Sequence, residues 1–122
     1  MHTNTLAGKR ILIAEDEPLI AMEHSALLSD AGGEIAASCA TGREAMDCIR
    51  DMAIDVAVID FVLADGTSEA LQGLLKRKHI PFVVISAYPR ALVRTEPGQD
   101  VLQKPVPRNV LCDRVEAACC PA

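Results

Sequence analysis

Residues 55–60 read Asp55-Val56-Ala57-Val58-Ile59-Asp60, an apolar run that ends in a carboxylate. Such a run is typical of a strand that is buried on both faces of a parallel sheet. The turn residues Ala64-Asp65-Gly66-Thr67 follow shortly after it. Ligands of open parallel α/β sheets bind at the carboxyl ends of the strands. Asp60 is therefore predicted to lie at the edge of a sheet where a functional site can form.

Four other apolar runs predict the remaining strands of this sheet. They cover residues 9–14, 34–40, 80–85 and 100–103, and the run at 34–40 is less hydrophobic, which predicts a position near an edge. Helical patterns lie at residues 18–31, 41–53, 68–79 and from 107 onward. The predicted inward faces include Ala53 in the second of these helices and Ala70 in the third. Strands that alternate with helices form a parallel sheet with right-handed crossovers. The sequence therefore predicts an α/β domain with five parallel strands.

The segment from residue 88 to residue 100 interrupts this alternation. It contains two prolines and a glycine, and only Ala91-Leu92-Val93 is suited to a turn of helix. The fourth helix of the domain is therefore predicted to be irregular or shortened.

The composition excludes several classes of function. The chain has 122 residues, enough for one domain, and a formal net charge of −5. This charge and the scarcity of aromatic residues argue against nucleic-acid binding. No apolar run is long enough to span a bilayer, and the N-terminus lacks the apolar core of a signal peptide. We therefore expect a cytoplasmic protein without membrane or nucleic-acid partners.

The cysteines do not follow a metal-binding or redox pattern. There are five of them, with no C-x-x-C spacing: Cys39, Cys48, Cys112, Cys119 and Cys120. Zinc sites and thioredoxin-like sites therefore have no support in the sequence, and we expect reduced thiols.

Three consecutive carboxylates, Glu15-Asp16-Glu17, follow the predicted first strand. Such a cluster repels itself unless a cation compensates the charge, which indicates a metal site for Glu15 and Asp16. The alternative is an acidic first turn of a helix that begins with Pro18, and Glu17 fits either interpretation. His24 shares the apolar stripe of the same helix and is interpreted as a packing residue rather than a phosphorylation site.

The distinctive polar residues at the predicted strand ends all fall on one edge of the sheet. They are Glu15, Asp16, Asp60, Ser86 and Lys104. Carboxylates with an open side favour a hard cation, and Mg²⁺ is often held by one or two carboxylates plus phosphate oxygens. A carboxylate can also attack a phosphoryl group and form an aspartyl phosphate. The set predicts a phosphoryl site with Mg²⁺, in which Asp60 is the nucleophile and Lys104 and Ser86 hold phosphoryl oxygens.

These strand ends resemble the receiver domain of two-component response regulators, and the resemblance covers nearly the whole chain. Ile11–Glu17 is similar to the first strand and acidic pair of the family, and Asp60–Gly66 to its phosphoacceptor strand end and loop. Ser86-Ala87 resembles the hydroxyl residue and small neighbour of the family, and Lys104-Pro105 its lysine and usually cis proline.

The resemblance implies a flavodoxin-like, doubly wound five-stranded sheet with strand order 2-1-3-4-5. It also implies that a histidine kinase or histidine phosphotransfer protein phosphorylates Asp60, and that the signal passes on by contact with a downstream protein. The implied Mg²⁺ ligands are Glu15, Asp16, Asp60 and the backbone carbonyl of Val62. The implied phosphoryl-holding residues are Ser86 and Lys104. The chain would not be an enzyme beyond slow reactions of its own Asp60, which Val62 and Tyr88 would tune.

The chain departs from the family pattern in four places. Glu15 replaces the commoner aspartate, which still permits metal binding, and Ala64 replaces a usual proline, which predicts a looser loop. Val101 stands where an aromatic switch residue is frequent, and the segment between Ser86 and Lys104 is shorter than usual. The last two departures affect the aromatic-and-hydroxyl switch of the family. The ending Val-Leu-Gln-Lys-Pro is similar to that of a group of stand-alone receivers.

We expect residues 1–122 to form a single receiver domain, with a flexible lead-in at residues 1–8 and no output domain. One alternative is a pseudo-receiver, a binding module whose partner recognition does not depend on phosphorylation. A second alternative is a Mg²⁺-dependent phosphatase. This class commonly places a second aspartate two residues after the nucleophile, as a general acid and base. This chain has Val62 there, which argues against the turnover of an external substrate.

Overall fold

A five-stranded parallel sheet forms the centre of the computed structural model, which describes residues 5–96 and 98–119. Its strands are β1 (Arg10–Ala14), β2 (Glu34–Cys39), β3 (Val56–Asp60), β6 (Phe82–Ser86) and β7 (Val101–Gln103). They are ordered β2-β1-β3-β6-β7 and all adjacent pairs are parallel. In chain order this is 2-1-3-4-5, so the predicted doubly wound topology is confirmed, with the less hydrophobic second strand at an edge.

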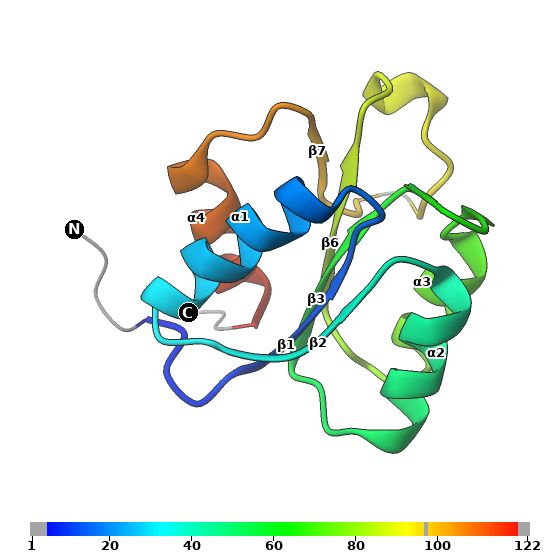
Figure 1. Cartoon of the computed structure of the whole chain (residues 1–122). Coiled ribbons are helices and arrows are strands. Elements are labelled where there is room, and N and C mark those ends of the chain that lie inside the picture. The colour runs from blue at the N-terminus through cyan, green and yellow to red at the C-terminus, as the bar shows by residue number, and fades with distance from the viewer. Residues whose placement is uncertain (1–4, 97, 120–122) are drawn as a thin grey trace.

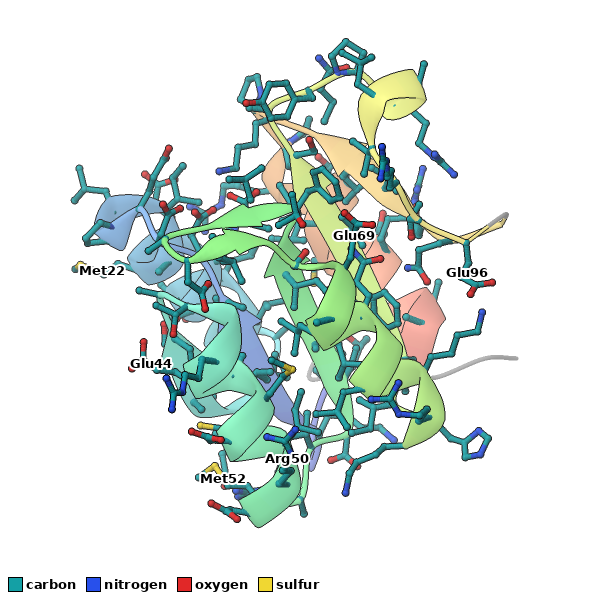
Figure 2. The ribbon with its side chains drawn as sticks, turned by 90° about the vertical axis from the view of Figure 1, so that its right-hand side faces the viewer. Met22, Glu44, Arg50, Met52, Glu69 and Glu96 are labelled. Carbon is teal, nitrogen blue, oxygen red and sulfur yellow. The ribbon has the colours of Figure 1, made fainter. Side chains whose placement is uncertain are left out.

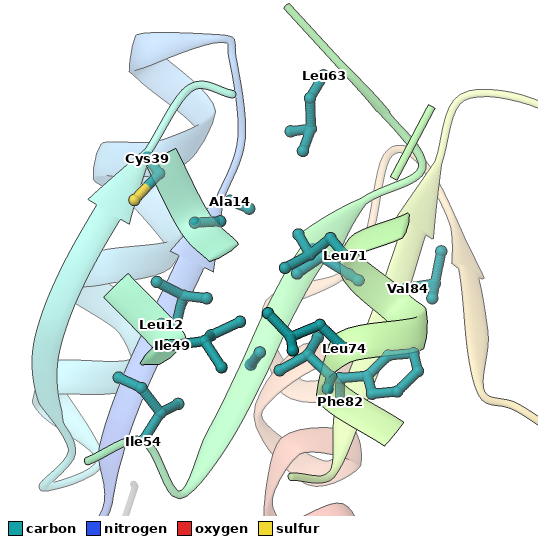
Figure 3. Close-up of a cluster of buried hydrophobic side chains, with 14 of the residues drawn as sticks. Leu12, Ala14, Cys39, Ile49, Ile54, Leu63, Leu71, Leu74, Phe82 and Val84 are labelled. Atoms are coloured by element: carbon teal, nitrogen blue, oxygen red, sulfur yellow. The ribbon is translucent and has the colours of Figure 1, made fainter. Parts of the chain in front are cut away.

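Two layers of helices cover the sheet (Figure 1). Helices α1 (Pro18–Asp30) and α4 (Arg108–Cys119) lie on one face, and α2 (Gly42–Asp51) and α3 (Glu69–Arg77) lie on the other. Each face has its own apolar cluster, because successive residues of a strand point to opposite sides. Figure 3 shows the cluster beneath α2 and α3. All residues of β3 are buried, as its apolar sequence predicts.

The predicted helix ends agree with the structure in part. The Thr41 hydroxyl accepts a hydrogen bond from the Glu44 backbone N–H at 3.1 Å, as expected at the start of α2. The helix ends at Asp51, and Ala53, which we expected on its inward face, is exposed. In α3, Ala70, which we expected to face the sheet, is exposed, whereas Gln72 is buried. The Gln72 side chain can be buried because its amide donates a hydrogen bond to the buried Ser68 hydroxyl at 3.3 Å.

The loop after Asp60 is not loose, contrary to the expectation from Ala64. It forms an antiparallel hairpin of β4 (Val62–Leu63) and β5 (Gly66–Thr67). The Ala64 N–H donates to the carbonyl of Ala40 at 3.1 Å. The Asp65 carboxylate accepts from the backbone N–H groups of Gly42 and Arg43 at 2.8 and 3.1 Å. The loop is therefore fastened to the start of α2, and these two hydrogen bonds lower the pKa of Asp65.

We expect Asp65→Ala to accelerate amide hydrogen exchange at Gly42 and Arg43 by roughly tenfold, because both amides lose their acceptor. Two-dimensional NMR exchange measurements would show the change at single residues. Asp51→Ala, at the exposed opposite end of α2, is the matched control and should leave both rates unchanged. Equal exchange in Asp65→Ala and the wild type would contradict the capping role.

The segment before β7 is irregular, as predicted. Its described residues contain one short 3₁₀ helix, Arg90–Leu92, in place of a full helix. Thr95 donates to the Gln72 side-chain oxygen at 2.9 Å, and Lys76 pairs with Glu96 at 2.6 Å. Figure 2 shows Glu96 beside α3. Hydrogen bonds to α3 therefore hold the segment where a packed helix is missing.

The predicted lead-in of residues 1–8 is partly integrated into the domain. Leu6 is fully buried, and its N–H donates to the carbonyl of Ala31 at 3.0 Å. Residues 1–4 lie outside the described part of the chain, as does Cys120 of the Cys119-Cys120 pair. Among the described residues 5–8, Leu6 therefore contributes its side chain to the core on the α1 side.

Candidate functional site

Each main-sheet strand other than β2 ends beside one of the predicted site residues. Glu15 and Asp16 follow β1, Asp60 ends β3, Ser86 ends β6, and Lys104 follows β7. The parallel topology places all of these at the carboxyl edge of the sheet. The Lys104-Pro105 peptide bond is cis, as the resemblance implied.

The Lys104 ammonium joins two carboxylates. Its Nζ lies 2.6 Å from Asp60 Oδ2 and 3.0 Å from Glu15 Oε1. The exposed fraction of the side chains is 16% for Lys104, 3% for Glu15 and 7% for Asp60, so the contact is largely shielded from water. Burial alone would lower the pKa of Lys104, but the hydrogen bonds to Asp60 and Glu15 raise it. The lysine is therefore held in its charged form.

Glu15 lies in an environment that opposes its ionisation. Its pKa is raised to about 7, first by burial and then by the negative charge of Asp60. The hydrogen bond from Lys104 and one from the Glu17 N–H, 3.2 Å from Oε2, act in the opposite direction. A single ammonium thus leaves the carboxylate pair undercompensated, and the site has capacity for further positive charge.

Three carboxylates at this edge form a cluster that fits a metal ion. One oxygen from each of Glu15, Asp16 and Asp60 lies within 4.8 Å of the others. Asp16 is exposed, whereas the other two are buried, so the cluster opens toward solvent through Asp16. An all-carboxylate set with an open side suits a hard divalent cation that keeps some of its water. Glu17 is not part of the cluster and is instead the residue that precedes Pro18 at the start of α1.

Asp60 is oriented by two contacts. Lys104 holds Oδ2, and the backbone N–H of Val62 donates to Oδ1 at 3.2 Å. Ser86 is buried beside it at the end of β6, and its hydroxyl oxygen accepts from the N–H of Tyr88 at 2.9 Å. The Lys104 N–H donates to the Ser86 carbonyl at 2.8 Å, which links the two residues through the backbone. The structure therefore brings the Lys104 ammonium into contact with Asp60 and Glu15, and places Ser86 at the end of the adjacent strand β6.

His24 and His79, the two histidines in the described part of the chain, lie where a structural role accounts for them. His24 is partly buried in α1, and burial lowers its pKa, with a further contribution from the Lys104 charge. This agrees with the prediction of a packing residue. His79 has φ of 58°, in the left-handed region just after α3, where it ends the helix.

The sequence did not reveal two features near the site. Asp65 fastens the loop after Asp60 to α2, but an aspartate in an Ala-Asp-Gly turn looks like an ordinary turn residue. The thiols of Cys39 and Cys48 lie 3.8 Å apart, although their spacing along the chain matches no common motif. Both depend on contacts between separate elements, which no local pattern displays.

A doubly wound sheet of this order, with an acidic cluster and a lysine at its carboxyl edge, defines an α/β domain of the signalling-receiver type. The chain belongs to the response regulator receiver domain family, whose model matches residues 11–116. It is therefore a receiver domain of two-component signalling, a regulatory domain.

Named relatives include two bacterial regulators. The Phyllosphere-induced regulator PhyR of Methylorubrum extorquens is 36% identical over 106 residues, covering 82% of this chain and 40% of that protein. The Transcriptional regulatory protein PdtaR of Mycobacterium tuberculosis is 32% identical over 82 residues, covering 66% of this chain and 40% of that protein. The chain thus spans about 40% of the length of the curated relatives that it matches.

Solved structures agree with this assignment. The solution structure of the REC domain of PhyR from Erythrobacter litoralis has a TM-score of 0.80 and 31% identity, covering 92% of this chain and 90% of that one. A response regulator receiver protein of Sinorhizobium medicae has a TM-score of 0.80 at 24% identity, covering 90% and 93%, and supports the fold alone. Among the described residues, no helix has the length and apolar character needed to cross a membrane.

Proposed function

We propose that the chain accepts a phosphoryl group on Asp60 from a histidine kinase or a histidine phosphotransfer protein, in the presence of Mg²⁺. The observation that carries this proposal is the contact of one ammonium with two buried carboxylates, 2.6 Å to Asp60 and 3.0 Å to Glu15. An ammonium in this place compensates the charge of Asp60 before transfer and that of the phosphoryl oxygens afterwards.

The other residues at the edge have complementary roles. Mg²⁺, held by the carboxylates of Glu15, Asp16 and Asp60 and the backbone carbonyl of Val62, would neutralise phosphoryl oxygens. The Val62 N–H on Oδ1 fixes the rotation of the Asp60 carboxylate. The Ser86 hydroxyl accepts from the Tyr88 N–H, so its own proton remains available to donate to a phosphoryl oxygen.

The output of this receiver would be contact with a downstream protein. The named relatives are regulators, and PhyR and PdtaR extend well beyond the part that this chain matches. We propose that residues 1–122 act as one receiver unit in the cytoplasm, where a histidine kinase has access to ATP.

Phosphorylation of Asp60 can be tested directly by intact mass. The protein is incubated with a small-molecule phosphodonor and Mg²⁺, and we expect the wild type to gain the mass of one phosphoryl group. Asp60→Asn should gain none, because the amide nitrogen and oxygen are poor nucleophiles. Chelation of the Mg²⁺ should suppress the gain in the wild type.

The matched control for this experiment is Asp55→Asn. Asp55 is an exposed aspartate that precedes the same strand at its opposite end, where its carboxylate accepts from the N–H of Arg10 at 2.7 Å. Asp55→Asn should be phosphorylated like the wild type. A wild type that gains no phosphoryl mass would refute the proposal.

The alternative function, a pseudo-receiver that binds its partner irrespective of phosphorylation, has one observation in its favour. Val101 is partly buried at the start of β7, in the place of an aromatic switch residue, and the described part of the preceding segment has only the 3₁₀ turn Arg90–Leu92. The usual route of the conformational signal is therefore altered. Failure of wild-type phosphorylation would favour this alternative.

A further inference from the structure

Two thiols face each other across the contact between β2 and α2. Cys39 is the last residue of β2, Cys48 lies in α2, and their Sγ atoms are 3.8 Å apart. Both thiols are free. A disulfide has an S–S bond of about 2.05 Å, so the sulfur atoms need to approach by about 1.8 Å. A distance of this size lies within the reach of side-chain rotation and small shifts of the helix.

The two thiols differ in their surroundings. Cys39 is buried in the apolar cluster of this face, near Ala14 (Figure 3), and its pKa is raised to about 12, first by burial and then by Cys48. Cys48 is partly exposed at the edge of the same cluster. Oxidants attack the thiolate, and access favours the more exposed sulfur. Cys48 is therefore the thiol that reacts first, and Cys39 is the one that resolves the product.

We propose that Cys39 and Cys48 form a peroxide-responsive thiol pair that closes to an intramolecular disulfide. The Cys48 thiol loses its proton and the thiolate attacks one oxygen of hydrogen peroxide. The O–O bond breaks, the sulfur is oxidised to sulfenic acid, and the hydroxide that leaves takes up a proton to form water. The Cys39 sulfur then attacks the Cys48 sulfur, the S–O bond breaks, and the departing hydroxide takes the Cys39 proton to form water. In total, two thiols and one peroxide give one disulfide and two waters. In a reducing compartment such disulfides are transient and sense oxidants.

The position of the pair connects it to the acidic edge. The carbonyl of Cys39 accepts from the Glu15 N–H at 2.9 Å, and the carbonyl of the next residue, Ala40, accepts from the Ala64 N–H at 3.1 Å. These bonds tie the end of β2 to the acidic cluster on one side and to the loop after Asp60 on the other. Closing the disulfide displaces the end of β2, so the Glu15 amide changes its environment.

Peptide mapping tests the disulfide in the unmodified protein. Trypsin cleaves after Arg10, Arg43 and Arg50, so Cys39 lies in peptide 11–43 and Cys48 in peptide 44–50. After treatment with hydrogen peroxide and blocking of free thiols, we expect these two peptides to be joined, with a mass two hydrogens below their sum. A thiol reductant should separate them. The proposal would be overturned if peptides 11–43 and 44–50 stayed unlinked. It would also be overturned if Cys48 were oxidised to sulfinic acid and no disulfide formed.

Two variants and a second readout test the connection to the site. Cys119→Ser leaves both thiols in place and should form the joined peptides as the wild type does, whereas Cys48→Ser should not. NMR of the metal-free protein should show a shift of the Glu15 amide resonance on oxidation in the wild type, reversed by reductant. The same treatment of Cys48→Ser, which controls for methionine oxidation, should leave this resonance unchanged. A wild-type disulfide without a Glu15 shift would overturn the connection to the acidic edge.

Discussion

Replacing Lys104 with methionine lowers the free energy of unfolding of the metal-free protein by about 3 kcal/mol at pH values above 7. The lysine contacts Glu15 and Asp60, whose side chains are only 3% and 7% exposed. Without the ammonium, two buried carboxylates face each other with no cation, and each loses a charge-assisted hydrogen bond. Urea denaturation in the presence of a chelator measures this loss.

Three companion experiments separate charge compensation from the packing of the lysine stem. Asp60→Asn in the Lys104→Met background should recover much of the lost stability, because one carboxylate no longer repels the other. Excess Mg²⁺ should narrow the difference from the wild type, since a divalent cation compensates the same carboxylates. Lys78→Met, at an exposed position after α3, should change stability by at most about 0.5 kcal/mol. Full stability of Lys104→Met in chelator would show that the ammonium does not stabilise the folded protein.

The topology of the sheet could be predicted because its determinants are local. The residues of β3 are apolar and end in Asp60, and the other strand ends are marked by Glu15, Ser86 and Lys104 in the same way. Parallel topology then places these ends at one edge, without any knowledge of the packing. Amphipathic periodicity likewise predicts which helix faces are inward. Its errors, such as Ala70 and Ala53, fall on small residues for which burial contributes little.

What the sequence did not predict depends on hydrogen bonds between distant segments. The loop after Asp60 was expected to be loose because Ala64 replaces a proline, but Asp65 anchors it to the N–H groups at the start of α2. The raised pKa of Glu15 also has a tertiary origin, because it arises from burial and from Asp60 on a neighbouring strand. Residue types at strand ends thus predict which side chains lie close together. Their protonation depends in addition on how deeply the surrounding elements bury them.

Glu15→Gln stabilises the metal-free protein above pH 7 and has no effect below about pH 4.5. The pKa of Glu15 rises from 4.5 to about 7 on folding, so between these values the folded state binds more protons than the unfolded state. The free energy of unfolding therefore falls as the pH rises through this window, and the glutamine removes that fall. The shift corresponds to at most about 3 kcal/mol. Screening through the open side of the site reduces the expected gain to about 1–2 kcal/mol.

Mg²⁺ should reverse the sign of this effect. With saturating Mg²⁺ the wild type gains stability by mass action, and Glu15→Gln gains less because it has lost one carboxylate ligand. Asp16→Asn is the matched control. Asp16 belongs to the same cluster but is exposed. Its replacement should therefore reduce the stabilisation of the folded protein by Mg²⁺. In the absence of metal, the free energy of unfolding of this variant should change with pH as that of the wild type does. Thermal unfolding across the pH range, with chelator and with Mg²⁺, measures both effects. If Glu15→Gln kept the wild-type fall in stability between pH 4.5 and 7, another group would be the one that takes up the proton on folding.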